Sequence, residues 1–311
     1  MRRRLPPLGS LLAVGGVLVA LPFLLSDYDV SLAAQVGVFF VAILGLNILT
    51  GYTGQISIGH GAFMAIGGYT TAVMSRDHHT NLVVTMLMAF AICFLIGLIV
   101  GLPALRLSGV YLALATFALA VSVPQLPLKW STFLGGSGGV QSSTTVSHLW
   151  LYGAAWTVSA VLFVLAWLIL RGRVGRAFRA VRDSEIAAVA SGIELPVYKT
   201  LAFGISAAYA GIAGSLFVLA TNGFAQPSEF GVFLSLQLLV GAAVAGLGSL
   251  WGILAGAAFV GLLPQVSSSV PLIGSAHGRD VVFGAAVVLV MLLLPDGFAG
   301  LLLRLRWLAR A

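Results

Sequence analysis

The stretch TNLVVTMLMAFAICFLIGLIVGLPAL, residues 80–105, contains no Asp, Glu, Lys or Arg. A helix rises about 1.5 Å per residue, so about 20 mainly apolar residues cross the hydrocarbon core of a bilayer. Residues 82–102 are therefore predicted to form a membrane-spanning helix. This stretch decides the fold class, because a charge-free apolar run of this length is typical of a transmembrane span.

The rest of the chain repeats this pattern on both sides. Charge-free stretches also cover residues 5–26, 30–75, 107–128, 130–170, 200–228, 230–278 and 281–295. We predict spans at residues 8–25, 30–49, 57–74, 82–102, 109–127, 149–170, 200–220, 231–247, 250–269 and 280–295. The expected fold is all-α, a polytopic integral membrane helix bundle formed by residues 1–311 as a single domain. It has about ten transmembrane helices; eight or nine are the alternatives, because Gly-rich segments can be short or re-entrant.

Composition agrees with this fold class. Hydrophobic residues make up 59% of the chain and charged residues 8%, whereas soluble domains carry about 25% charged residues. Repeated small residues such as Gly97 and Gly101 predict close helix contacts. The formal charge of +7 does not indicate nucleic-acid binding, because the basic residues lie in loops and at the ends. Cys93 is the single cysteine, which excludes an intrachain disulfide and gives no sign of a metal site.

Basic residues near span ends predict the orientation. In the ten-span arrangement Arg2–Arg4, Arg106, residues 171–182 and residues 304–310 all fall on one side, which we assign to the cytoplasm. Both termini are then cytoplasmic, and Met1–Leu25 is expected to be an uncleaved first span. Residues 129–148 form the longest external loop, whose GGSGG core and Ser/Thr run predict a flexible or partly folded segment.

Residues 45–71, GLNILTGYTGQISIGHGAFMAIGGYTT, form the densest polar patch within a charge-free stretch. Polar groups in lipid must find partners, so they face a bundle interior or a water-filled path. We interpret the patch as a lining of a translocation path or a broken helix; the alternative is a tight interfacial turn. His60 is expected to be a hydrogen-bonded structural residue rather than a proton relay, because no predicted span contains an Asp or Glu.

Residues 171–199 form a charged island in this apolar chain, with six of the sixteen Lys/Arg and three of the nine acids. Arg176–Ala190 is predicted to be helical, with an interruption at Asp183 and Ser184 that supplies a helix N-cap. Gly192 is expected to end the second helix, and Pro196 follows it. The alternatives for this island are a docking surface and a basic loop that only sets topology.

The sequence lacks the motifs of an autonomous pump or an enzyme. Neither Lys129 nor Lys199 follows a Gly, so there is no GxxxxGK[ST] phosphate loop. HExxH and CxxC are also missing. We expect no enzyme activity and no bound cofactor, so any ATP-driven transport would need another subunit to hydrolyse ATP.

The motifs resemble those of the LivM-type permeases of branched-chain amino acid ABC importers. GLNILTGYTGQISIGHGAFMAIGGYTTAV (45–73) and GRAFRAVRDSEIAAVASGIELPVYKTLAFGISAAYAGIAGSLF (175–217) carry the resemblance. GLGSLWGILAGAAFVGLLP (246–264) and LPDGFAGLL (294–302) add weaker support. Together the four matches cover about a third of the chain, in the order in which the family has them.

The resemblance implies a permease subunit in the bacterial inner membrane that pairs with a second, LivH-type permease. Two cytoplasmic ATPase subunits would dock on coupling helices, and an extracytoplasmic substrate-binding protein would deliver the substrate. It assigns the substrate path to Asn47, Tyr52, Gln55, Ser57, Gly59 and His60. It assigns ATPase coupling to Arg182, Asp183, Ser184, Glu185, Ala187, Ala188 and Gly192, within the cytoplasmic coupling segment 171–199.

The resemblance leaves the cargo open, because related permeases carry urea, short-chain amides or aromatic acids. A different class, a secondary transporter that needs no ATPase, predicts ionisable residues inside the spans. All nine acids lie at predicted span ends or in loops, so the sequence favours the ATP-driven importer.

Overall fold

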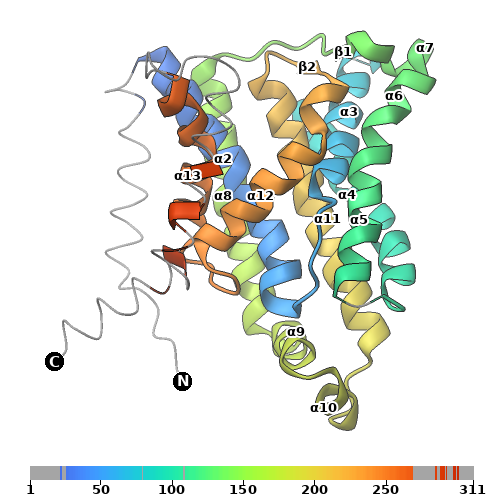
Figure 1. Cartoon of the computed structure of the whole chain (residues 1–311). Helices are drawn as coiled ribbons and strands as arrows, with labels where there is room; N and C mark the ends of the chain where they lie inside the picture. Colours follow the sequence, from blue (N-terminus) through green and yellow to red (C-terminus); the bar gives the residue numbers. More distant parts are fainter. Residues whose placement is uncertain are drawn as a thin grey trace, which may run out of the picture.

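The computed structural model describes residues 22 and 26–268, apart from 79 and 108, together with short pieces between residues 284 and 300. Long helices run between two ends of a bundle: α9 and α10 protrude at one end, and β1 and β2 lie at the other (Figure 1). The main helices are α2 (Asp27–Leu46), α3 (His60–His78), α4 (Leu82–Ala104), α5 (Val110–Ser122), α8 (His148–Arg171), α9 (Arg173–Asp183), α10 (Glu185–Ala190), α11 (Leu195–Ala220), α12 (Val232–Ala245) and α13 (Ile253–Ser268). The shorter elements are the π-helix η2 (Asn47–Tyr52), η3 (Val123–Gln125), α6 (Leu126–Lys129), α7 (Ser131–Leu134), η4 (Gly136–Gly138), β1 (Val140–Gln141), β2 (Phe224–Ala225) and η5 (Pro227–Phe230).

Helices long and apolar enough to cross a membrane confirm a multi-pass membrane protein. Within the described residues there are six: Asp27–Tyr52, Leu82–Ala104, Val110–Lys129, His148–Arg171, Leu195–Ala220 and Pro227–Ala245. The predicted spans 57–74 and 250–269 coincide with α3, which is less apolar, and with α13, whose apolar part is shorter. The predicted span 8–25 and most of 280–295 lie outside the described residues.

Two helices form the centre of the bundle. The apolar windows of α2 and α11 are 83% and 89% buried, whereas those of α4, α5 and α8 are each 28% buried. The outer helices therefore leave most of their apolar residues uncovered by this chain, and α2 and α11 are covered by protein. The predicted small-residue contact is confirmed, because Gly97 of α4 faces Gly204 and Ala207 of α11.

Gly211 is a position at which even one added methyl group should weaken this packing. A Cβ atom there would lie 2.6 Å from the Cys93 Sγ and 2.9 Å from the Ala89 carbonyl oxygen. We expect Gly211→Ala to destabilise the protein by about 1–3 kcal/mol through overpacking. Gly153→Ala on α8 is the matched control, because nothing lies within 4 Å of its added Cβ. The thermal unfolding midpoint of the detergent-solubilised protein measures both; equal midpoints would contradict this packing.

The predicted external loop 129–148 is a folded cap rather than a flexible segment. β1 pairs antiparallel with β2, with Val140 opposite Ala225, which adds a minimal two-stranded sheet to an otherwise helical fold. The Ser142 hydroxyl donates to the Ser75 hydroxyl at 2.8 Å, and the Ser75 and Thr144 hydroxyls are also 2.8 Å apart. These bonds fix the loop on the end of α3, so its Ser/Thr run has a structural use that composition alone did not indicate.

Candidate translocation path and coupling segment

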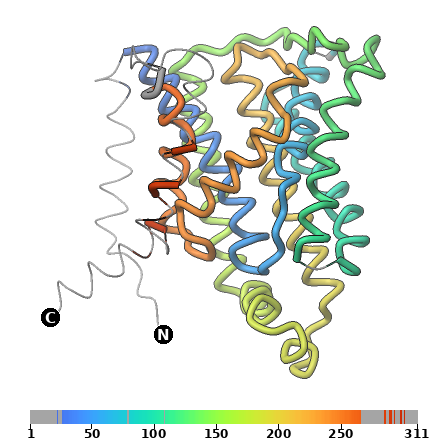
Figure 2. The backbone as a smooth tube through the Cα atoms, viewed as in Figure 1, coloured from blue at the N-terminus to red at the C-terminus, as the bar shows by residue number. Residues whose placement is uncertain are grey.

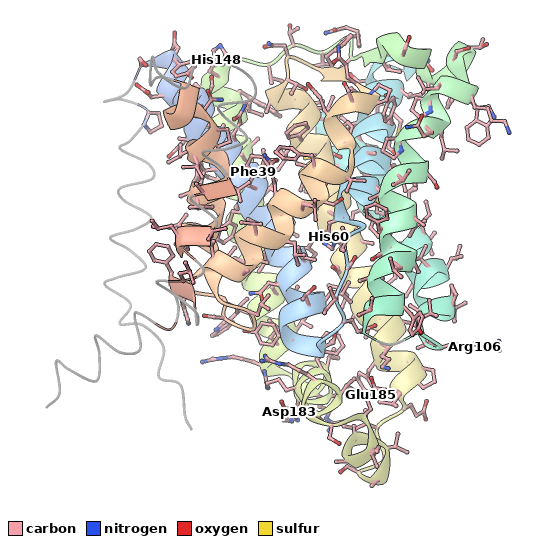
Figure 3. All side chains as sticks on the ribbon, in the orientation of Figure 1. Phe39, His60, Arg106, His148, Asp183 and Glu185 are labelled. Atoms are coloured by element: carbon pink, nitrogen blue, oxygen red, sulfur yellow. The ribbon has the colours of Figure 1, made fainter. Side chains whose placement is uncertain are left out.

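The polar motif forms a break between α2 and α3. The π-helix η2 ends α2, and α3 begins only at His60. Between them, residues 54–59 leave the lower end of α2 and run back along the bundle without helical structure (Figure 2). His60 lies about midway between the two ends of the bundle (Figure 3). The structure therefore agrees with the predicted broken helix and not with a tight turn at the bundle end.

Hydroxyl groups from neighbouring helices satisfy the backbone of this break. The Ile58 amide donates to the Thr116 Oγ1 of α5 at 3.0 Å, and the Gly61 amide donates to the Ser235 Oγ of α12 at 2.9 Å. Backbone groups outside regular structure need such partners where water is scarce. The sequence did not single out Thr116 or Ser235, because a lone hydroxyl on an apolar helix resembles many others.

Asn47 links the break to the turn between α12 and α13. Its side-chain amide donates to the Ser249 carbonyl at 2.7 Å, and its Oδ1 accepts from the Gly248 amide at 2.8 Å. The side chain is fully buried. Since one side chain satisfies two groups of a turn about 200 residues away in sequence, η2 and this turn are held in one arrangement.

The side chains predicted to line the path are turned into the protein. Asn47, Tyr52, Gln55, Ser57, Gly59 and His60 are all buried. The His60 Nε2 lies 3.2 Å from the Ser206 hydroxyl of α11, as expected for a structural histidine. These six residues shape the break from within, so in this chain alone they do not form an exposed lining.

The opposite edge of the break is open. Gly54 is exposed, and Ile56 is 43% exposed. Non-helical backbone at membrane depth is tolerated where protein covers it or where it lines a water-filled cavity. The Gly54–Ile56 edge is therefore the part of the motif that this chain leaves uncovered, and the sequence reasoning missed Ile56.

The charged island forms two short helices as predicted. α9 ends at Asp183, and α10 follows after Ser184, whose hydroxyl accepts from the Ala187 amide at 3.3 Å as an N-cap. The Ile193 amide donates to the Ala188 carbonyl at 3.0 Å across Gly192, which has a φ of +80°. This bond is typical of a glycine-terminated helix. Gly175 lies inside α9, packed on the Leu170 carbonyl, and does not break the helix.

Arg182 connects α9 to the break. Its Nη1 donates to the Gly51 carbonyl oxygen at 2.6 Å, and its side-chain stem lies against Gly54. The Gly51 carbonyl belongs to the C-terminal end of the α2–η2 helix, where unpaired carbonyls carry partial negative charge. The guanidinium group thus neutralises this helix end and holds it to α9.

Glu185 connects α10 to the central helix α11. Its Oε1 lies 2.6 Å from the Lys199 Nζ, and the side-chain exposures of Lys199 and Glu185 are 7% and 49%. Asp183 and Glu185 both lie at the protruding end of the molecule (Figure 3). Each short helix is therefore attached to one of the two buried helices, α9 to α2 and α10 to α11.

The outer surface of α10 is apolar as well as charged. Ile186 is 85% exposed and Val189 is 56% exposed, beside the exposed Asp183 and Glu185. Ala187 and Gly192 are also exposed, whereas Ala188 is 2% exposed and packs inward. Ala188 is thus a packing residue, and Ile186 is the surface residue that the motif-based assignment omitted.

Comparisons with known proteins agree with these features. Residues 30–293 match the model of a family described as the permease component of branched-chain amino acid transport systems. The high-affinity branched-chain amino acid transport permease LivM of Salmonella typhimurium is 30% identical, over 92% of this chain and 73% of that protein. LivH of Escherichia coli is 25% identical over 83% of this chain and 89% of that protein. The autoinducer 2 import permease LsrC of an Enterobacter strain is 29% identical over 95% of this chain and 87% of that protein.

No solved structure matches the chain significantly. The family match covers most of the chain, including the break, the α9–α10 segment and the α12–α13 turn. The chain therefore belongs to the family of permease components of branched-chain amino acid transport systems.

Proposed function

We propose that the chain is one membrane subunit of an ATP-driven importer for branched-chain or similar amino acids in a bacterial inner membrane. A second, LivH-type permease lies beside it, two cytoplasmic ATPase subunits drive it, and an extracytoplasmic protein delivers the substrate. Its ten spans place both termini and residues 171–199 in the cytoplasm, and residues 129–148 outside. The chain itself binds no cofactor, and the partner subunits use the ATP.

The observation that carries this proposal is the Arg182–Gly51 contact at 2.6 Å. It joins the protruding α9–α10 segment to the break in the membrane-spanning part. When the ATPases close, they shift α9 and α10 through the exposed Ile186 and Val189. Arg182 passes this motion to η2, and Asn47 passes it on to the α12–α13 turn.

The substrate path follows the open edge of the break. The Gly54–Ile56 edge needs a cover of protein or water, and a second permease supplies the opposite wall. The six buried motif residues hold this edge in place and do not line the path themselves. The substrate crosses between the two permeases when α9 and α10 move.

Replacing Asp183-Ser184-Glu185 with Gly-Gly-Gly tests the coupling role. The replacement removes the N-cap of α10 and the Glu185–Lys199 ion pair. We expect uptake to fall to background in reconstituted vesicles while ATP hydrolysis continues. Co-purification of the second permease and the ATPases shows that the complex still assembles. Uptake at the unmodified rate in an assembled complex would refute the coupling assignment.

A second cargo class has an observation in its favour. A relative that covers most of this chain has autoinducer 2 rather than an amino acid in its name, so this fold is not restricted to one kind of cargo. Urea, short-chain amides and aromatic acids are further candidates from the resemblance. Calorimetric titration of the partner binding protein with each compound decides among them.

A further inference from the structure

Glu229 and Tyr69 are polar groups that the translocation break and the coupling segment do not use. Glu229 lies in η5, between β2 and α12, and Tyr69 lies in the middle of α3. Both belong to the half of the bundle between His60 and the β1–β2 end. In the proposed orientation this half faces the outside, where the binding protein delivers the substrate.

The packing of η5 fixes Glu229 beside α3. The rings of Tyr69 and Phe230 are 6.2 Å apart between centroids, and Phe230 is fully buried. Phe230 also meets Phe217 of α11 edge-on at 5.6 Å. At the start of α3, a Cβ on Gly61 would lie 3.1 Å from the Phe230 carbonyl oxygen. These contacts hold the backbone at Glu229 beside α3.

Both groups lack a partner within the part of the chain that the structure describes. The Tyr69 hydroxyl and the Glu229 Oε2 are shielded from solvent and make no hydrogen bond there. The two groups are neighbours through Phe230, which follows Glu229 in the chain and packs against the Tyr69 ring. Neither of the two ion pairs among the described residues includes Glu229. Glu229 is partly exposed, and its shielded Oε2 has no counter-ion among the described residues. A partly shielded carboxylate without a counter-ion is costly, and in membrane proteins such groups mark substrate or ion sites.

We propose that Glu229 and Tyr69 bind the primary ammonium group of the transported amino acid on its way to the break. This assignment rests on the proposed function. A carboxylate supplies the charge and a phenol oxygen supplies a second acceptor, which together suit a donor with three N–H bonds. The face of the Tyr69 ring adds cation–π attraction. The neighbouring Phe217 ring, which is partly exposed, suits a branched aliphatic side chain.

Charge and shape variants in the complete transporter test this site. Labelled leucine is delivered by saturated binding protein to vesicles with internal ATP, ATPases and both permeases. We expect Glu229→Gln to lower uptake about tenfold or more, because hydrogen bonds to charged groups are strong. Glu229→Asp should restore part of the uptake, and Tyr69→Phe should lower it less than Glu229→Gln. Asp29→Asn, at the exposed start of α2, is the control and should leave uptake unchanged.

A loss of assembly in Glu229→Gln would instead indicate a structural partner, such as a lysine of the second permease, and would overturn the proposal. Uptake unchanged in Glu229→Gln would overturn it too. If the proposed function itself is wrong, the unmodified complex does not import leucine with ATP at all, which distinguishes that failure from failure of the Glu229 site.

Chemical labelling tests recognition of the ammonium group directly. A hydrophobic carbodiimide reacts with shielded carboxylic acids, and mass spectrometry reports the modified fraction of Glu229 in the detergent-solubilised complex. We expect leucine to protect Glu229, and 4-methylpentanoate, which has the same side chain but no ammonium group, to give no protection. Equal protection by the two compounds, or none by either, would contradict the assignment.

Discussion

Replacing Arg182 with alanine is expected to lower ATP-driven uptake at least about tenfold, because a charge-assisted hydrogen bond is lost from a helix end. The variant leaves the Gly51 carbonyl at the end of η2 without the guanidinium donor that lies at 2.6 Å. α9 can then move without moving the break. ATP hydrolysis stimulated by the loaded binding protein should persist, so the amount of leucine imported per ATP falls.

The arginine series on α9 supplies its own controls. Arg176 is exposed on the same helix, so Arg176→Ala removes an equal charge and should change uptake by less than twofold. Arg182→Lys retains the charge and one donor, and we expect intermediate coupling. If Arg182→Ala and Arg176→Ala import equally, the contact with Gly51 has no part in coupling.

Replacing Lys199 with glutamate should have the second large effect. Lys199 is 7% exposed and pairs with Glu185 at 2.6 Å, so the variant sets two carboxylates against each other at the junction of α10 and α11. Breaking a fully buried pair costs about 3–5 kcal/mol. Glu185 is half-exposed, so solvent screens part of the repulsion and we expect about 2 kcal/mol. Both uptake and the yield of assembled complex should fall.

Exchanging the two charged residues shows whether the ion pair itself matters or whether position 199 simply requires a lysine. The double variant Lys199→Glu with Glu185→Lys restores the attraction and should recover much of the yield and uptake. Recovery is incomplete, because a lysine at the N-terminus of α10 is less favourable than a glutamate. Thermal midpoints and uptake for both single variants and the double variant complete the cycle. Purely additive losses would show that Glu185 and Lys199 act independently.

The sequence predicted the regular features of this fold well. Charge-free stretches placed the long helices because the bilayer demands a fixed length of apolar chain. Ser184 and Gly192 predicted the two short helices, because capping chemistry is local. For residues 129–148 the sequence left open a flexible or a partly folded segment, because the contacts that fold it involve Ser75 and β2, both far away in sequence.

The sequence identified many residues of the candidate site but not how they are arranged in space. The motif at residues 45–71 indicated the break, yet alternation along an extended segment turned Gln55 and Ser57 inward and Ile56 outward. The same limit applied to α10, where Ala188, which was assigned to coupling, packs inward and Ile186, which was not assigned, is exposed. Contacts such as Arg182–Gly51 and Asn47–Gly248 join segments 131 and 201 residues apart, which no local pattern encodes.

We propose that cargo crosses this permease only when the ATPases move α9 and α10. The most direct measurement is leucine uptake by vesicles that hold both permeases and the two ATPases, with loaded binding protein on one side and ATP on the other. We expect leucine uptake to require ATP and to continue after the proton and sodium gradients are collapsed. Uptake that persists without ATP and follows an imposed ion gradient would contradict it.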